Sequence, residues 1–137
     1  MRHLLVEARL EDRVETDSAG TGSWHVGSAP DERSTAAARE RGVTLEGTAR
    51  RVEVTDFGRY DLLVAMDRTN ERDLRALAPD AAARDRVVLL RSFDPEAVAA
   101  RDLDVPDPYY GDGDGFERVL DVVERACRGL LEHAAPP

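Results

Sequence analysis

A carboxylate held between two prolines, Asp107, is the side chain best placed to do chemistry. Pro106 and Pro108 each lack a backbone donor and push the residue before them towards an extended conformation, so Asp107 is expected on a stiff loop. Tyr109 and Tyr110 follow at once. A positioned carboxyl beside two aromatic rings is typical of a proton donor to an aromatic or phosphorylated ligand. The same residues also fit an ordinary turn with two packed tyrosines.

A second candidate segment is the glycine-rich stretch at residues 18–27, which carries Trp24, the only tryptophan. Gly20 and Gly22 would need a third glycine at position 25 to form a dinucleotide fingerprint, and His25 stands there. Two interpretations therefore stay open. The stretch is either a surface loop anchored by a half-buried tryptophan or the rim of a site that stacks on a ligand ring.

Composition excludes several classes of function. The formal charge of −9 argues against sequence-independent nucleic-acid binding, because phosphate backbones would be repelled. All 19 basic residues are arginine, so Schiff-base and Walker-type lysine chemistry are excluded. The three histidines lie at scattered spacings, and we expect neither a metal nor a cofactor. With no signal peptide and no apolar run of membrane-spanning length, the sequence predicts a soluble, cytoplasmic protein without membrane contact.

The single cysteine, Cys127, excludes an internal disulfide and a four-cysteine zinc site. It falls on the apolar face of the predicted last helix, where a thiol is usually a small core residue with a raised pKa. Six residues on stands His133 rather than an arginine. Cys127 is therefore predicted to be structural and not a nucleophile in a phosphate-binding loop.

The elements that must position these loops alternate between strands and helices within one expected domain, residues 1–137. Hydrophobic periodicity predicts helices at 1–10 with Leu4, Leu5 and Ala8 on one face, at 31–41 closed by Gly42, at 68–78 capped by Asp67, and from Phe116 onwards. Thr55 is expected to cap a short turn. Strands are expected at 13–17, 60–66 and 87–90, with a polar loop at 91–104. This order predicts a parallel sheet with helices on both faces and ligands at the carboxyl ends of its strands.

Eight segments, in order along the chain, closely resemble the low molecular weight protein tyrosine phosphatase family. They are Asp17-Ser18-Ala19-Gly20-Thr21-Gly22, Trp24-His25-Val26-Gly27, Pro30-Asp31-x-Arg33, Ala49-Arg50, Asp56-Phe57, Ala65-Met66-Asp67-x-x-Asn70, Arg72-Asp73-Leu74 and Val105-Pro106-Asp107-Pro108-Tyr109-Tyr110-Gly111. The Asp-Pro-Tyr-Tyr-Gly element is the most specific of these. The resemblance implies a three-layer α/β fold of the phosphotyrosine phosphatase I type.

The resemblance also implies hydrolysis of phosphotyrosine proteins or aryl phosphates through a cysteinyl-phosphate. Asp107 would protonate the departing phenolate oxygen and then act as the base for the attacking water. Ser18 would brace the phosphate-binding loop. Four ring-bearing side chains would wall the substrate pocket: Trp24, His25, Tyr109 and Tyr110.

The family's Cys-x5-Arg loop, which lies between the first strand and the first helix, has no counterpart in these 137 residues. Residues 1–10 match the back half of that first helix, so we expect Met1 to be an internal methionine of a longer reading frame, or the chain to be truncated. In the family the first strand lies inside the sheet, between the strands expected here at 13–17 and 60–66. We therefore expect a gap in the sheet that favours self-association.

Three functional interpretations follow. The first is a phosphatase-family domain that lacks its nucleophile and phosphate-binding arginine and is inactive as given. The second is a pseudophosphatase that binds a partner through Tyr109 and Tyr110. The third is an arsenate reductase, which the single cysteine disfavours because that chemistry relays electrons through additional thiols.

Overall fold

The centre of the fold is a pair of parallel strands, β1 (Leu63–Ala65) and β2 (Val87–Leu89). The computed structural model describes residues 1–22, 25–107 and 115–135. Successive side chains of a strand point to opposite faces of the sheet. On one face the strands contribute Leu63, Ala65, Val87 and Leu89 to a buried core. Val64 packs against a second core on the other face, so the sheet is covered on both sides, as predicted.

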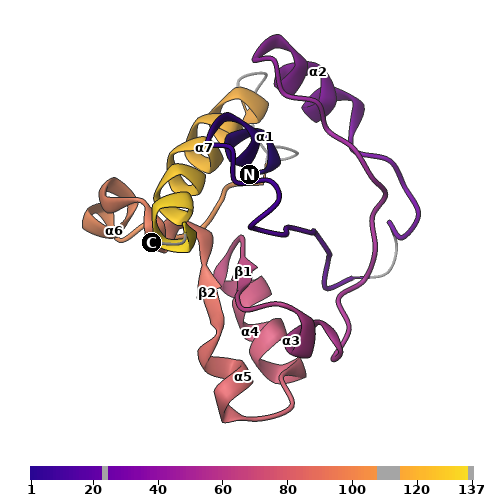
Figure 1. Cartoon of the computed structure of the whole chain (residues 1–137), viewed down its shortest axis with the longest axis vertical. Helices are drawn as coiled ribbons and strands as arrows, with labels where there is room; N and C mark the ends of the chain where they lie inside the picture. The colour runs from indigo at the N-terminus through magenta and orange to yellow at the C-terminus, as the bar shows by residue number, and fades with distance from the viewer. Residues whose placement is uncertain (23–24, 108–114, 136–137) are drawn as a thin grey trace.

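Three short helices cover the first face. They are α3 (Asp56–Arg59), α4 (Arg68–Leu77) and α5 (Ala81–Asp85), which lie together in the lower half of Figure 1. Phe57, Leu74 and Ala83 carry their buried side chains into the first core. This face therefore rests on a continuous apolar cluster.

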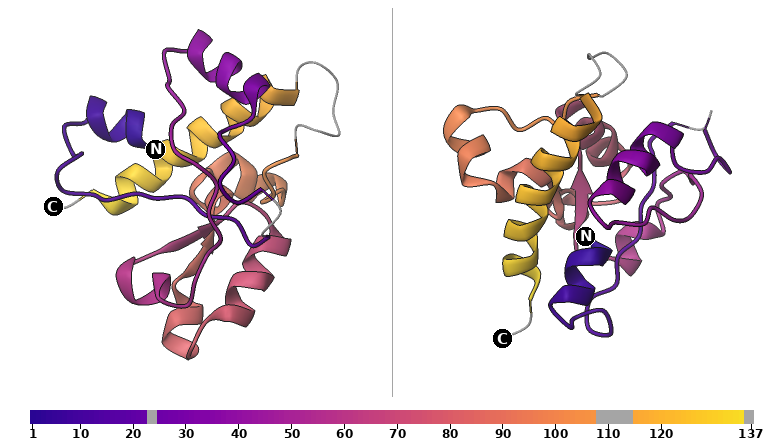
Figure 2. Two further views of the ribbon diagram at one scale, coloured as in Figure 1. Left: turned by 90° about the vertical axis from the view of Figure 1, so that its right-hand side faces the viewer. Right: turned by 90° about the horizontal axis from the view of Figure 1, so that it is seen from above.

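The second face is covered by α1 (Arg2–Glu7) and the long α7 (Gly115–Ala134), which contact each other. Their buried residues Leu4, Ala126 and Cys127 form the second core with Leu90. Helix α2 (Glu32–Glu40) packs in turn against α7, as Figures 1 and 2 show. The helices on the two faces confirm the three-layer arrangement expected from the sequence.

Helix boundaries follow the local capping signals. Asp31 accepts hydrogen bonds from the backbone N–H of Arg33 and Ser34, and Asp67 accepts one from Asn70 N–H at 2.7 Å. Gly42 takes a φ of 75°, and the N–H of the next residue, Val43, donates to the carbonyl of Ala38 at 2.9 Å. The N–H of Gly42 donates to the carbonyl of Arg39 at 2.9 Å, and the two bonds form a Schellman motif, which confirms the predicted end of α2.

Several local predictions were wrong. Residues 14–19 form no strand, because no neighbouring ladder pairs with them within the described chain, whose sheet consists of β1 and β2. The predicted polar loop at 91–104 contains a 3-10 helix, η1 (Leu90–Phe93), and α6 (Pro95–Ala100). Asp94 caps α6 through Glu96 N–H, with proline at the first helical position, a start signal that the prediction overlooked. Both observed strands are also shorter than predicted.

Two single-residue expectations were wrong in whole or in part. Ala8 is exposed, because α1 ends at Glu7 and Ala8 is its C-terminal cap. Thr55 is the N-cap residue of α3, as expected, but its side chain makes no capping hydrogen bond. The side chain that bonds the backbone here is Asp56, whose carboxylate accepts the N–H of Glu53 at 2.8 Å.

Candidate functional site

The segment that leads to Asp107 is bonded to the carboxyl end of β1. Val105 N–H donates to the carbonyl of Met66, the residue directly after β1, at 2.8 Å. The carboxylate of Asp104 accepts the N–H of Arg68, the first residue of α4, at 2.9 Å. Asp107 lies two residues beyond this anchor and is exposed. Its segment therefore reaches the edge of the sheet where ligands of parallel α/β proteins bind.

A buried arginine fastens the same segment to β2. Arg91 follows β2 in η1, is only 7% exposed, and donates from Nη1 to the carbonyl of Asp104 at 2.7 Å. The same nitrogen lies 3.3 Å from the carboxylate of Asp102, whereas Nε of Arg91 has no partner within the described residues. Because a desolvated guanidinium depends on its few remaining bonds, we infer that the 102–105 segment is held firmly.

The glycine-rich loop is closed by the segment at residues 49–52. Gly20 N–H donates to the carbonyl of Arg50 at 2.8 Å, and Val52 N–H donates to the carbonyl of Gly20 at 2.9 Å. At the far side of the loop, Ala49 exchanges two backbone bonds of 2.7 and 2.8 Å with residues 27 and 28. The loop is therefore pinned at both ends, and His25 lies exposed in the turn between them.

A charged network lies behind the start of this loop. Arg50 donates two hydrogen bonds, of 3.0 and 3.1 Å, to the buried carboxylate of Asp56. It donates a third, of 3.1 Å, to the carboxylate of Asp17. Hydrogen bonding from Arg50 holds the pKa of Asp56 below its ordinary value, and the bond to Asp56 raises the pKa of Arg50. The pKa of Asp17 is also lowered, chiefly because Ser18 N–H donates to it and then because Arg50 is near. All three groups are charged at neutral pH, and Asp17 among them accepts the backbone N–H of Ser18.

Cys127 is buried on α7, within the second core, against which Val105 of the segment before Asp107 also packs. Burial raises the pKa of its thiol, so the thiolate that attacks phosphorus is disfavoured. The prediction of a structural cysteine is confirmed.

The predicted site residues thus belong to two anchored segments. Ser18 and His25 lie in the loop tied to residues 49–52, and Asp107 follows the segment tied to β1 and β2. The other three predicted wall residues lie outside the described part of the chain: Trp24, Tyr109 and Tyr110. The prediction that they face one another stays a prediction.

Two supporting arginines were not assigned a role from the sequence. Arg50 stands in one of the recognised segments, yet nothing local indicates that it binds carboxylates 33 positions before it and 6 positions after it. Arg91 begins a stretch that was predicted to be a polar loop, whereas its side chain is buried. Both roles depend on contacts that only the folded chain creates.

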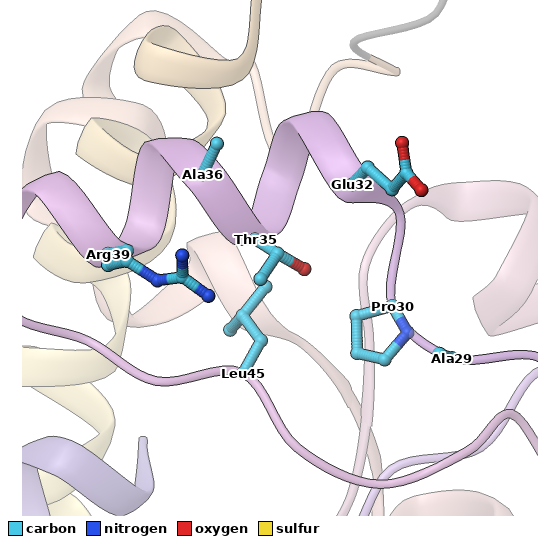
Figure 3. Close-up of a pocket in the computed structure, with 7 residues that line it drawn as sticks. All are labelled: Ala29, Pro30, Glu32, Thr35, Ala36, Arg39 and Leu45. Carbon is cyan, nitrogen blue, oxygen red and sulfur yellow. The ribbon is translucent and has the colours of Figure 1, made fainter.

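A surface pocket of about 400 Å³ lies along α2, and neither Asp107 nor His25 is among its lining residues. Figure 3 shows its lining residues: Ala29, Pro30, Glu32, Thr35, Ala36, Arg39 and Leu45. Elsewhere in residues 1–22, 25–107 and 115–135, no three His, Cys, Asp or Glu side chains are grouped as metal ligands would be.

Within the same described ranges, no helix has the length and the apolar composition that crossing a membrane requires.

Comparison with known proteins places this arrangement in one family. The family model described as low molecular weight phosphotyrosine protein phosphatase matches residues 1–135. A low molecular weight protein-tyrosine-phosphatase of Streptomyces coelicolor is 49% identical over 136 residues, covering 96% of this chain and 82% of the relative. The human low molecular weight phosphotyrosine protein phosphatase is 31% identical over 97% of this chain and 82% of its own length.

A solved structure agrees with the sequence relatives. The crystal structure of a protein tyrosine phosphatase from Entamoeba histolytica superposes with a TM-score of 0.87 at 31% identity, covering 96% of this chain and 81% of the other. The parallel sheet, the helices on both faces and the matched sequence define a phosphatase-type α/β domain. The chain belongs to the low molecular weight phosphotyrosine protein phosphatase family.

Proposed function

We propose that this chain is a single-domain member of its family that contributes the proton-transfer residue and the aromatic wall of a phosphotyrosine-hydrolysing site. The observation that supports it most is the anchoring of the segment before Asp107 to the carboxyl ends of β1 and β2. General acids must be held within hydrogen-bond reach of the leaving group, and such an anchor serves that need. The relatives named for protein tyrosine phosphatase activity point to the same substrate class.

The reaction would run in two steps. A thiolate attacks phosphorus, an S–P bond forms, the P–O bond to the phenol breaks, and Asp107 gives its proton to the departing phenolate. A water molecule then attacks the phosphorus of the phosphocysteine, and the Asp107 carboxylate takes a proton from that water. The S–P bond breaks, so phosphate and thiolate are released. The side chains proposed to hold the phenyl ring are those of Trp24, His25, Tyr109 and Tyr110, and Ser18 is proposed to brace the phosphate loop.

We further propose that the 137 residues alone do not carry out this reaction. Their one thiol, that of Cys127, is buried in the core and has a raised pKa. No arginine stands six residues after it, because that position is His133. A nucleophile and a phosphate-binding arginine would have to be added to these residues for the reaction to proceed.

The test is a fusion in which a family segment containing the strand and the Cys-x5-Arg loop precedes Met1. We expect this fusion to hydrolyse phenyl phosphate and Asp107→Asn to lower its kcat by about 10²- to 10⁴-fold, the usual contribution of a general acid. The loss should shrink with p-nitrophenyl phosphate, whose leaving group needs less protonation. Asp61→Asn, at an exposed carboxylate ahead of β1, is the matched control. A fusion whose Asp107→Asn form keeps full activity on both substrates would contradict the role of Asp107.

A pseudophosphatase that binds a partner through Tyr109 and Tyr110 is the second proposal, because it too follows from a family fold without an accessible thiol. A partner recovered by the chain and lost on Tyr109→Ala with Tyr110→Ala would favour it. Arsenate reduction is the weaker alternative, since one buried thiol cannot relay electrons to a second.

Self-association through an open sheet edge also remains a proposal. Pairing with a second copy along β1 would satisfy backbone groups that β2 does not bond. Sedimentation velocity across a concentration series tests it, and a constant monomer mass would contradict it.

A further inference from the structure

The groove along α2 has a defined floor and walls. The segment before α2 supplies Ala29 and Pro30, the helix supplies Thr35 and Ala36, and the chain returning after the helix supplies Leu45. The backbone bonds between Ala49 and residues 27 and 28 hold these two segments together. At about 400 Å³ the groove is near the lower end of the roughly 300–1,000 Å³ typical of ligand pockets. It therefore suits one or two side chains rather than a large cofactor.

Two opposite charges mark the ends of the groove. Neither Arg39 nor Glu32 forms an ion pair or hydrogen bond through its side chain with any described residue. The nearby Arg41, in contrast, forms ion pairs with Glu117 at 2.6 Å and Asp121 at 2.8 Å on α7. In Figure 3 the guanidinium of Arg39 extends beside Leu45, and Glu32 stands at the other end of the helix. The groove thus offers one cation and one anion that pair with none of the described residues.

The spacing of these charges specifies what would fit. Glu32 and Arg39 are seven residues apart and lie on the same helical face, about 10 Å apart along the axis. Three residues of a polyproline II segment span about 9 Å and return to the same side of the chain. A peptide with opposite charges three positions apart therefore matches the groove in length and polarity. A dianionic phosphate matches less well, because Glu32 repels it.

We propose that this groove binds an extended peptide segment of a partner protein, in which an acidic residue pairs with Arg39, a basic residue three positions away pairs with Glu32, and an aliphatic side chain between them contacts Leu45. The proposal does not depend on phosphatase activity, because none of its contacts involves Asp107 or a phosphorylated residue. It adds a docking surface beside the loop that carries His25.

The experiment is an NMR titration of the isotope-labelled 137-residue chain with a blocked peptide containing Lys-Pro-Leu-Glu. We expect amide shifts to concentrate at residues 35–39 and at Leu45. Replacing the peptide glutamate with glutamine should weaken binding by roughly two- to fivefold, the range of exposed ion pairs. Arg39→Glu should weaken binding of this peptide more than the glutamine exchange does, because it adds repulsion, and should favour a Lys-Pro-Leu-Lys peptide instead.

The matched control is Arg84→Glu, which changes net charge equally at an exposed arginine of α5, far from α2 in Figure 1. It should leave binding of the first peptide unchanged. If Arg39→Glu unfolds the chain, Arg39→Gln is used in its place. This variant should reduce binding of the glutamate peptide and leave binding of the glutamine peptide unchanged. Absence of binding, shifts spread over the surface, or equal losses in the Arg39 and Arg84 variants would each overturn the proposal.

Discussion

Asp56 is the carboxylate on which the support of the glycine-rich loop depends. It is 9% exposed and accepts three hydrogen bonds, two from Arg50 and one from Glu53 N–H. Asp56→Asn removes the charge while keeping the shape. We expect it to lower the free energy of unfolding by about 1.5–3 kcal/mol at pH 7, the range for hydrogen bonds to charged groups. Urea unfolding measures the change, and Glu15→Gln, at an exposed pair with Arg59, should change little.

The same carboxylate gives a pH dependence with a defined sign. The folded chain lowers the pKa of Asp56, so its stabilisation is present above the unfolded value near 3.9 and is lost as pH falls through the folded pKa. The difference in stability between the wild type and Asp56→Asn should therefore shrink below about pH 4. A difference that stays constant from pH 7 to pH 2.5 would contradict the assigned cause.

Cys127 gives a further prediction at a single residue. Burial raises the pKa of its thiol, so iodoacetamide should modify the folded chain far more slowly at pH 8 than it modifies the chain in urea. Mass spectrometry measures the modified fraction over time. Equal rates in the two states would contradict the burial of the thiol.

Local chemistry explains which residues could be predicted. Asp31, Asp67 and Gly42 act on backbone groups within four positions, and their capping roles follow from sequence alone. Arg50 and Arg91 act on partners that are distant in the chain or brought close by the fold. Their roles could not be predicted, because any of the 19 arginines could in principle fill them.

Among the described elements, η1 and α7 make a close backbone contact. A Cβ built on Gly129 would lie 1.9 Å from the carbonyl oxygen of Phe93, so the two backbones touch where no side chain fits. Gly129→Ala should destabilise the chain by about 1–3 kcal/mol through overpacking. Gly58→Ala in α3 meets nothing within 4 Å and should be neutral or stabilising by about 0.4–1 kcal/mol. Thermal and urea unfolding measure the stability of both variants. Equal effects of Gly129→Ala and Gly58→Ala would contradict the close backbone contact at Gly129.

The anchor of the Asp107 segment makes a second prediction at this scale. Arg91→Met removes the bond to the carbonyl of Asp104, so the Val105 amide should exchange with solvent about tenfold faster. Arg84→Met, at an exposed residue of α5, should leave this rate unchanged. Hydrogen exchange read by NMR measures both. An unchanged Val105 rate in Arg91→Met would show that Arg91 does not hold the segment.

Element types were predicted well where hydrophobic periodicity was long, as in α7, or where caps bounded a helix, as in α2 and α4. The strand expected at 13–17 failed for a different reason. Alternating side chains show only that a segment can pair, and residues 14–19 find no ladder in the described chain. Helix α6 was missed because its six residues are too few to show a period.

At the scale of the whole molecule, two apolar cores enclose the short sheet and carry two anchored loops. The family match over residues 1–135 explains the fold. Sequence order alone predicted the parallel sheet and its covering helices. It could not predict whether the two loops face each other, because their separation depends on the packing of α2 and α7.

Our central proposal is that this chain holds the proton-transfer side of a phosphotyrosine site without a thiol able to attack phosphorus. The most direct measurement is hydrolysis of p-nitrophenyl phosphate by the purified 137-residue chain, with Cys127→Ser as the control. We predict that both forms release nitrophenol at the rate of buffer alone. Turnover above buffer that Cys127→Ser abolishes would contradict the claim.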